Sequence, residues 1–512
     1  MAGKRDRQME QKRATLNIPL ARHRDVLSWD QTTIDRLVAA AIEAAVKVGL
    51  KLDDDAESVY LKEAEKRGMR IDWGERAVMF SDKDIRDTID VMRKTRPVPA
   101  PLREATTTAG REERFLVGNG ANLLFDFEAW DVKAPTATDL VTACQWAQGY
   151  DEVNELFPPF LLKDTDQQLV TIYSYALACK HCRKKVYHEQ PTEPVHVKYL
   201  DKMARVVERR RGYFQPMQHM EYINPPFRLG RRAIATMLAR VDMGACTVMG
   251  VGPMAIGGMS APVTVAGGAV AALAEVLCGL TFFRLLRPGF GLETVICTGS
   301  LDLRTARVSY YSMRTHLQNL AAWELVVRGL GVDCQPLTWY REANEPGMQA
   351  LYEFGMAQSF FSATVGRCTP ELGGLACGNI FSPEQAVLDI EIVKEFNELL
   401  DGFEVSEDAV GLEEIVNARF EQGVHMSSDH TIRHMKSGIP FSSALFRGLP
   451  AGAQHNKSRT QTQELLDMAH ESVKGATRKG QAAAPDAELG RELYEFVKEA
   501  AREIGVEAPS LL

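Results

Sequence analysis

Short apolar runs alternate with longer amphipathic stretches through residues 136–440. The short runs have the length of buried strands, and the longer stretches have the three-and-four spacing of amphipathic helices. The eight predicted strands lie at residues 156–162, 185–190, 217–223, 246–252, 293–299, 334–340, 369–375 and 424–429. Eight repeats of a strand followed by a helix predict the α/β class and a (β/α)8 TIM barrel. An open doubly wound sheet is the alternative for the same pattern.

The regions on either side of the predicted barrel have a different pattern. Residues 34–50 and 81–94 have helical spacing, and Ser81 stands where a helix cap is expected. Residues 114–132 predict a β-hairpin that turns at Gly118-Asn119-Gly120. The predicted division is residues 1–135 for N-terminal helices and hairpin, 136–440 for the barrel, and 441–512 for a helical C-terminal extension.

One long apolar stretch, residues 245–283, has the length of a membrane span and carries a single charge, Glu275. Pro253 and Pro262, together with several glycines, would interrupt a helix in its first half. A buried strand, a turn and a buried helix therefore explain the stretch better than a membrane span does.

Composition narrows the class of protein. Hydrophobic residues make up 45% and charged residues 25% of the 512 residues, as in soluble globular proteins, and the net charge is −8. A mildly acidic chain is not expected to bind nucleic acid or an anionic membrane. Nine cysteines without a disulfide framework and an N-terminus unlike a secretory signal predict a cytoplasmic protein. Cys179 and Cys182 lack a second pair to complete a zinc site, so we expect structural thiols there.

Aromatic and polar side chains gather where the predicted strands end, which is where a TIM barrel builds its chemistry. They are Tyr187, His188, Glu189, Glu221, Tyr222, Trp339, Tyr340 and Glu371. Ordinary packing explains any one of the aromatic residues. Several of them at one barrel mouth would form a cage for a quaternary ammonium group, which aromatic ring faces attract.

Three histidines, His425, His430 and His434, lie at and after the eighth predicted strand. Their spacing is not that of a known zinc ligand set, so we predict no metal site and favour structural or substrate-binding roles. The chain also lacks the phosphate-binding, serine hydrolase and zincin motifs; Gly250-Val251-Gly252 alone is a weak nucleotide signal.

Several motifs make the chain resemble the trimethylamine methyltransferase family. They are VMGVGPMAIGGMSAPVTVAGGAVAALAEVLCGLTFFRLLRPGF (248–290), INPPFRLG (223–230), SLDLRT (300–305), SPEQAVLDIE (382–391) and GVHMSSDHTIRHM (423–435). The resemblance implies a (β/α)8 barrel that moves a methyl group from a methylated amine to cobalt(I). It also implies that the corrinoid cofactor is carried by a separate partner protein. We further expect a homo-oligomer.

The sequence resembles members of the family without pyrrolysine, which implies a quaternary amine such as glycine betaine as substrate. A quaternary nitrogen leaves as a neutral amine, so no general acid is needed, and a neutral cage favours the methyl step over a carboxylate at the nitrogen. The cage candidates are Trp339, Tyr340, Tyr222 and Tyr187. The candidates to bind a substrate carboxylate or to face the corrinoid are His425, His430 and Arg304. Asp302 is expected to orient Arg304.

Two segments, 310–319 and 341–353, depart from the family pattern. Because both are expected beside the pocket, a barrel that binds a methylated amine or a corrinoid protein without turnover is the alternative function. A zinc-dependent methyltransferase is a third possibility, and it would need Cys or His ligands at the strand ends.

Overall fold

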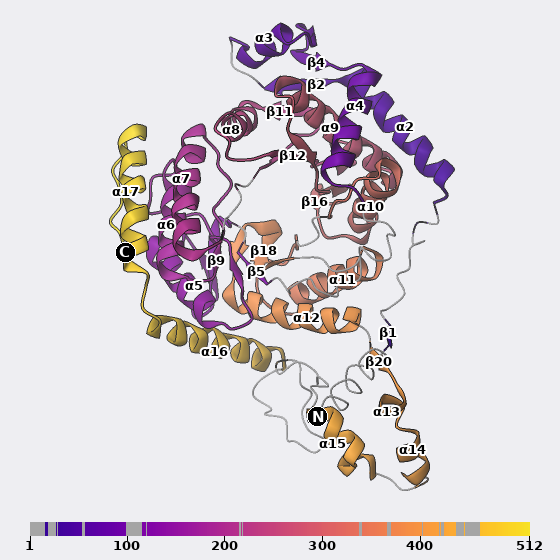
Figure 1. Ribbon diagram of the computed structural model, residues 1–512, viewed down its shortest axis with the longest axis vertical. Helices are drawn as coiled ribbons and strands as arrows, with labels where there is room; N and C mark the ends of the chain where they lie inside the picture. Colours follow the sequence, from indigo (N-terminus) through magenta and orange to yellow (C-terminus); the bar gives the residue numbers. More distant parts are fainter. Residues whose placement is uncertain are drawn as a thin grey trace, which may run out of the picture.

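Parallel strands form a ring at the centre of the computed structural model, with helices around the outside (Figure 1). The structure describes residues 16–18, 27, 29–53, 57–98, 115–118, 120–213, 217, 219–336, 340–365, 370–401, 403–418, 420, 424–436, 445 and 461–512.

The ring consists of two parallel ladders and one parallel bridge. β17, β5, β8 and β9 pair in that order, and so do β10, β12 and β14. Their bounds are β5 (Leu116–Val117), β8 (Glu155–Leu156), β9 (Lys185–Val186), β10 (Met220–Tyr222), β12 (Val248–Gly252), β14 (Gly291–Glu293) and β17 (Glu371–Leu372). The parallel bridge between Ile296 and Pro336 adds the segment between β14 and β17. The predicted (β/α)8 barrel is therefore confirmed.

A helix follows each segment of the ring. They are α5 (Ala137–Gly149), α6 (Val170–His181), α7 (Pro194–Arg211), α8 (Arg231–Asp242), α9 (Val265–Leu286), α10 (Met313–Glu324), α11 (Met348–Thr364) and α12 (Pro383–Asp401). The sequence determines several of their starts: Thr136 and Asp139 form a reciprocal cap on α5, and Thr264 caps α9. The helices bury their apolar sides against the strands, which places the core in the layer between strands and helices.

The first and last strands differ from the sequence prediction. Leu116–Val117 was expected in a hairpin, but it is the barrel strand between β8 and β17. The hairpin lies just after it, with β6 (Leu123–Asp126) paired to β7 (Asp131–Lys133). The strand expected at 424–429 is wrong, because Val424–Ser427 forms a 3-10 helix, η3, outside the ring (Figure 1). The predicted division of the chain into three regions stays a prediction.

The long apolar stretch is buried, as predicted. Its first part is β12 and its second part is α9, which among the described residues is the one helix long and apolar enough to cross a membrane. In the most apolar 18-residue stretch of α9, 78% of the residues are buried inside the protein. α2 (Gln31–Val48) and α10 pack against it, which accounts for its apolar composition.

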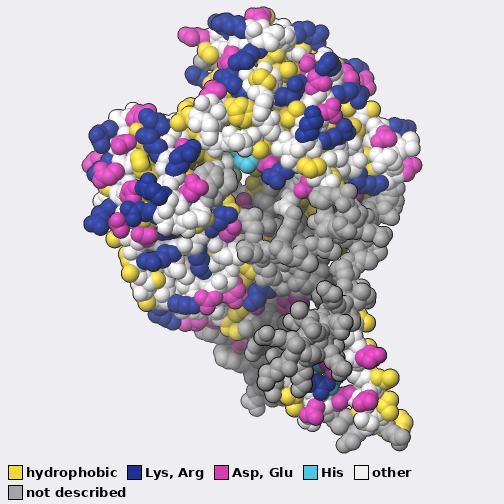
Figure 2. Space-filling view, viewed as in Figure 1, with side chains coloured by type: hydrophobic (Ala, Val, Ile, Leu, Met, Phe, Trp, Pro, Cys, Tyr) yellow, Lys and Arg dark blue, Asp and Glu magenta, His cyan; other side chains and the backbone are white. Residues whose placement is uncertain are grey.

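The C-terminal helices α16 (Gln461–Ala482) and α17 (Ala487–Ile504) wrap the outside of the barrel (Figure 1). A side chain at Gly149 or Gly480 would overlap the facing backbone, so α5 and α16 approach closely there. Ion pairs such as Lys198–Glu503 join α7 to α17, and Figure 2 shows charged side chains of both signs over that side of the molecule.

A separate arm projects from the barrel after α12 (Figure 1). It contains β20 (Phe403–Val405), which pairs with β1 (Leu16–Ile18), followed by α13 (Glu407–Val410), α14 (Leu412–Ala418), η3 and α15 (Asp429–Lys436). This arm carries the three histidines that were expected at the end of the eighth strand.

Candidate functional site at the barrel mouth

Three tyrosines meet at the end of the barrel where the strands end. The ring centroids of Tyr310 and Tyr340 lie 5.4 Å apart at an angle of 50°. Tyr222, at the end of β10, is close enough to Tyr340 for its charge to influence the pKa of Tyr340. All three tyrosines are partly exposed.

Glycines on the neighbouring strands provide the space for these rings. A Cβ at Gly252 would lie 2.7 Å from Tyr222 Cε1, and a Cβ at Gly299 would lie 3.2 Å from Tyr310 Cε1. Tyr310 directly follows the antiparallel pair β15 (Gly299–Asp302) and β16 (Arg307–Ser309), which extends the mouth beyond the barrel strands. The sequence therefore builds the aromatic group by placing glycines opposite tyrosines.

Burial keeps the tyrosines protonated. It raises the pKa of Tyr310 to about 12 and the pKa values of Tyr222 and Tyr340 further. The Cys297 thiol and the Glu371 carboxylate add to the effect on Tyr222 and Tyr340. The rings thus remain neutral phenols, whose faces attract cations.

Two carboxyl groups complete the mouth. Glu371 is on β17 and is partly exposed, whereas Glu189, after β9, is 7% exposed. Burial and then the charge of Glu371 raise the pKa of Glu189 well above its usual range. Glu371 is thus close enough to influence Tyr222, Tyr340 and Glu189, and the raised pKa of Glu189 favours its protonated form.

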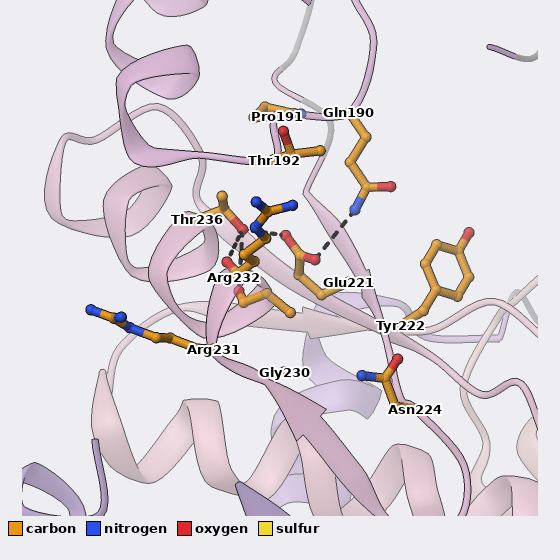
Figure 3. Close-up of a pocket in the computed structure, with 11 residues that line it drawn as sticks. Gln190, Pro191, Thr192, Glu221, Tyr222, Asn224, Gly230, Arg231, Arg232 and Thr236 are labelled. Atoms are coloured by element: carbon orange, nitrogen blue, oxygen red, sulfur yellow. Dashed lines mark hydrogen bonds between the residues drawn. The ribbon is translucent and has the colours of Figure 1, made fainter. Parts of the chain in front are cut away.

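A cavity of about 460 Å³ borders this group on one side, between the ends of β9 and β10 and the first turn of α8 (Figure 3). Tyr222 and Asn224 line it near the mouth, and Arg232 lines it at α8. Glu221 is fixed behind it, accepting hydrogen bonds from Thr236 at 2.7 Å and from Gln190 at 3.3 Å. Those bonds keep Glu221 directed toward α8 and away from the tyrosines.

The structure brings together some of the predicted cage residues. Tyr222 and Tyr340 lie in the same group, and Trp339 lies outside the described residues. Tyr187 donates to Glu155 at 3.2 Å, and Lys185 Nζ lies 5.0 Å from the centre of its ring. A cation of the protein itself is thus already on the Tyr187 ring.

The predicted carboxylate-binding residues do not converge on the mouth. His425 and His430 lie on the arm, where His430 Nε2 is 2.8 Å from the backbone oxygen of Asp408, so their expected position at a strand end is wrong. Arg304 is in the turn of the β15–β16 hairpin, and its side chain is 91% exposed. Asp302 accepts from the backbone N–H of Arg304 at 2.9 Å, and this contact suits the orienting role expected of it.

Tyr310 is the residue at this site that the sequence prediction missed. Its position in one of the two segments that depart from the family pattern was the available signal. In the part of the chain that the structure describes, no group of three or more His, Cys, Asp or Glu side chains could hold a metal ion.

Comparisons with known proteins point to one family. The profile of the family described as trimethylamine methyltransferase (MTTB) matches residues 2–505. Trimethylamine methyltransferase MttB1 of Methanosarcina mazei is 30% identical over 162 residues, which are 32% of each protein. Trimethylamine methyltransferase MttB of Methanosarcina barkeri is 24% identical over 249 residues, which are 48% of each. The chain thus spans a third to a half of the length of these curated relatives.

Among solved structures, the crystal structure of the Methanosarcina barkeri monomethylamine methyltransferase (MtmB) aligns with 87% of this chain and 88% of that chain. Its sequence identity is 12% and the TM-score is 0.42.

Proposed function

Because the chain belongs to the trimethylamine methyltransferase family, we propose that it moves a methyl group from a quaternary amine of the betaine type to cobalt(I) of a corrinoid on a partner protein. The observation that carries this proposal is the group of three neutral, partly exposed tyrosines beside Glu371 at the barrel mouth. Aromatic ring faces suit a cation whose charge is spread over methyl groups.

The chain's own residues would act by binding and positioning. A cation–π contact contributes about 0.5–1 kcal/mol at an exposed site and about 2 kcal/mol when desolvated, so several rings can hold the ammonium group without a hydrogen bond. The corrinoid supplies the nucleophilic cobalt(I) that accepts the methyl group. By binding the ammonium group in one orientation, these residues would give the transfer the advantage of an intramolecular step, which is the main source of the expected acceleration.

An apolar rim around the mouth supports docking of the corrinoid protein. Met259, Leu303 and Met348 are among the most exposed large apolar side chains, and each lies in a loop after a barrel strand or at the start of the following helix. A corrinoid protein that docks at the mouth would have these side chains available for apolar contact, and exposed apolar patches mark interaction surfaces. Arg304 stands on the same rim.

The cavity beside Tyr222 supports the choice of a betaine. Its lining includes the Asn224 amide and the Arg232 guanidinium, although Arg232 also pairs with Glu193 at 3.0 Å. Hydrogen-bond donors in a cavity that Tyr222 also lines suit a carboxylate tail. A substrate held at both ends is better oriented for transfer than one held only at its nitrogen.

The test is methyl transfer to free cob(I)alamin. The full-length protein is incubated with glycine betaine, a longer-chain betaine, tetramethylammonium or trimethylamine, and methylcobalamin formation is followed by its absorbance. We expect the betaines to react and trimethylamine not to react. Saturable betaine binding without methylcobalamin would favour the alternative of a non-catalytic binder. We also retain a homo-oligomer and a cytoplasmic location as predictions; the described cysteines, all free, support the latter.

A further inference from the structure

Glu189 is a buried carboxyl group at the mouth that lacks a full set of hydrogen bonds. Its Oε1 has no hydrogen-bond partner among the described residues. Gly120 packs so closely against the carboxyl group that a Cβ there would lie 2.6 Å from Oε2 and 2.9 Å from Oε1. An unpaired buried carboxylate is far less favourable than the protonated acid. The packing therefore favours a proton on Glu189.

The charges near Glu189 also favour its protonated form. Glu371 faces it from β17, and its negative charge adds to the effect of burial in raising the pKa of Glu189. Tyr222, Tyr340 and Cys297 surround Glu371 and are held neutral, chiefly by burial. Below this layer, Lys185 pairs with Glu155 at 3.1 Å, so its charge is compensated.

We propose that Glu189 is a further catalytic residue, which gives its proton to the amine that is left after methyl transfer. This rests on the proposed function. The C–N bond of the quaternary amine breaks, its electron pair stays on nitrogen, and the methyl group goes to cobalt. The resulting tertiary amine then forms an N–H bond with the Glu189 proton and leaves Glu189 as a carboxylate. Glu189 takes a proton from solvent when the ammonium product leaves.

The order of these steps follows from the geometry of nitrogen. The lone pair forms on the side that the departing methyl group occupied, so Glu189 can donate its proton only after that side of the amine turns toward it. Glu189 would therefore prevent return of the methyl group and leave the methyl step itself unchanged. As a neutral acid it also avoids the ground-state stabilisation that a second carboxylate would give the ammonium ion.

Infrared difference spectroscopy of the full-length protein at pH 7 tests the proposal without turnover. Tetramethylammonium imitates the substrate nitrogen. Trimethylamine carries a proton at this pH and so imitates the N–H product, which the proposal places beside an ionised Glu189. We expect the C=O band of a protonated Glu189 to persist with tetramethylammonium and to be lost with trimethylamine, and both observations to be absent in Glu189→Gln. Glu189→Asp, which retains an acid, should restore the trimethylamine-dependent loss.

Glu275 offers a matched control. It is buried on α9, burial raises its pKa to about 8, and it should therefore contribute its own acid band at pH 7. Glu275→Gln should remove that band and leave the response to trimethylamine unchanged. The proposal is overturned if trimethylamine leaves the Glu189 band intact or if both amines abolish it. It is also overturned if the response to trimethylamine survives in Glu189→Gln. Absence of methyl transfer with every amine would overturn the proposed function and leave these spectra valid.

Discussion

A buried glutamate at one end of the barrel is fully paired and has a lowered pKa, whereas one at the other end is partly unpaired and has a raised pKa. Glu293, the last residue of β14, lies level with Gly250 and beside His219, which precedes β10, so it is at the end of the barrel where the strands begin. It contacts His219 Nε2 and accepts from Arg96 Nε at 2.6 Å. Burial alone would raise the pKa of Glu293, but the hydrogen bonds and charges of His219 and Arg96 outweigh it and lower the pKa. Glu189, at the mouth, has an unpaired Oε1 and a raised pKa.

This difference separates the stabilising end of the barrel from its chemical end. In TIM barrels, residues at the ends where strands begin serve stability, and catalytic residues stand where strands end. Paired carboxylates contribute to folding, whereas an unpaired one is maintained by the rest of the structure at a cost. The unpaired Oε1 therefore distinguishes Glu189 from Glu293, and also from the paired Glu221 at the same end of the barrel.

The largest effect should come from breaking a fully paired carboxylate. Asp389 on α12 accepts from the Arg341 guanidinium at 2.8 and 2.7 Å and from the backbone N–H of Gly373 at 2.8 Å, and both charged side chains are buried. Asp389→Ala would leave the Arg341 charge buried and unpaired, so we expect a loss of about 3–5 kcal/mol in unfolding free energy, measured by urea denaturation. Glu189→Gln is the control and should cost less than about 1 kcal/mol. Equal losses would remove the distinction between paired and unpaired carboxyl groups.

The second effect concerns Glu293 itself. Glu293→Gln should cost about 1–3 kcal/mol near neutral pH, because His219 and Arg96 lose a charged acceptor. The folded pKa of Glu293 lies below its unfolded value, so its contribution is present above the unfolded pKa and is lost as pH falls through the folded pKa. The difference in stability between wild type and variant should therefore shrink in acid. A difference that stays constant down to the folded pKa would contradict this assignment.

Much of the fold could be predicted from sequence, because helices follow local spacing and caps. The two errors concern strands. β5 is two residues long and is followed by Gly118, so its sequence favours a turn, and only its distant partners β8 and β17 make it a barrel strand. Residues 424–429 alternate like a strand but have no strand neighbour in the ring. Strand pairing is non-local, and a short apolar run carries no information about its partners.

The site was predictable to a similar extent. Tyr222, Tyr340, Glu189 and Glu371 follow from the rule that chemistry stands at strand ends. Tyr310 could not be found by that rule, since it lies on an added hairpin beyond the strand. Glu221 is paired with Arg240 on the helix that follows its strand, whereas Glu189 is unpaired at Oε1. This difference depends on how each helix packs on the strands, which the strand sequence alone does not specify.

A third, smaller effect tests the aromatic part of the mouth. Tyr340→Leu removes a ring face but keeps an apolar side chain, so we expect tetramethylammonium binding to weaken by about 0.5–2 kcal/mol, measured by calorimetry. Tyr187→Leu is the matched control, because the Tyr187 ring already has Lys185 5.0 Å from its centre. It should leave tetramethylammonium affinity unchanged. The reverse result would place the cation site one layer deeper in the barrel.

The smallest effect comes from a second histidine–glutamate pair outside the barrel. Its contribution to stability should depend on pH in the opposite direction to that of Glu293. His470 on α16 lies 2.8 Å from Glu384 and 3.0 Å from Glu128, and the hydrogen bond to Glu384 is the main cause of its raised pKa. A raised folded pKa means that the contribution is fully present below the unfolded pKa of His470 and is lost as pH rises through the folded pKa. Because the group is near the surface, His470→Gln should cost only about 0.5–1 kcal/mol in mild acid and nothing in alkali, measured by urea denaturation at several pH values. If the stability cost of His470→Gln instead grew with pH, the charge of His470 would not hold α16 against the barrel. The stacking of its ring on Phe127, with 4.2 Å between the centroids, would then account for the contact.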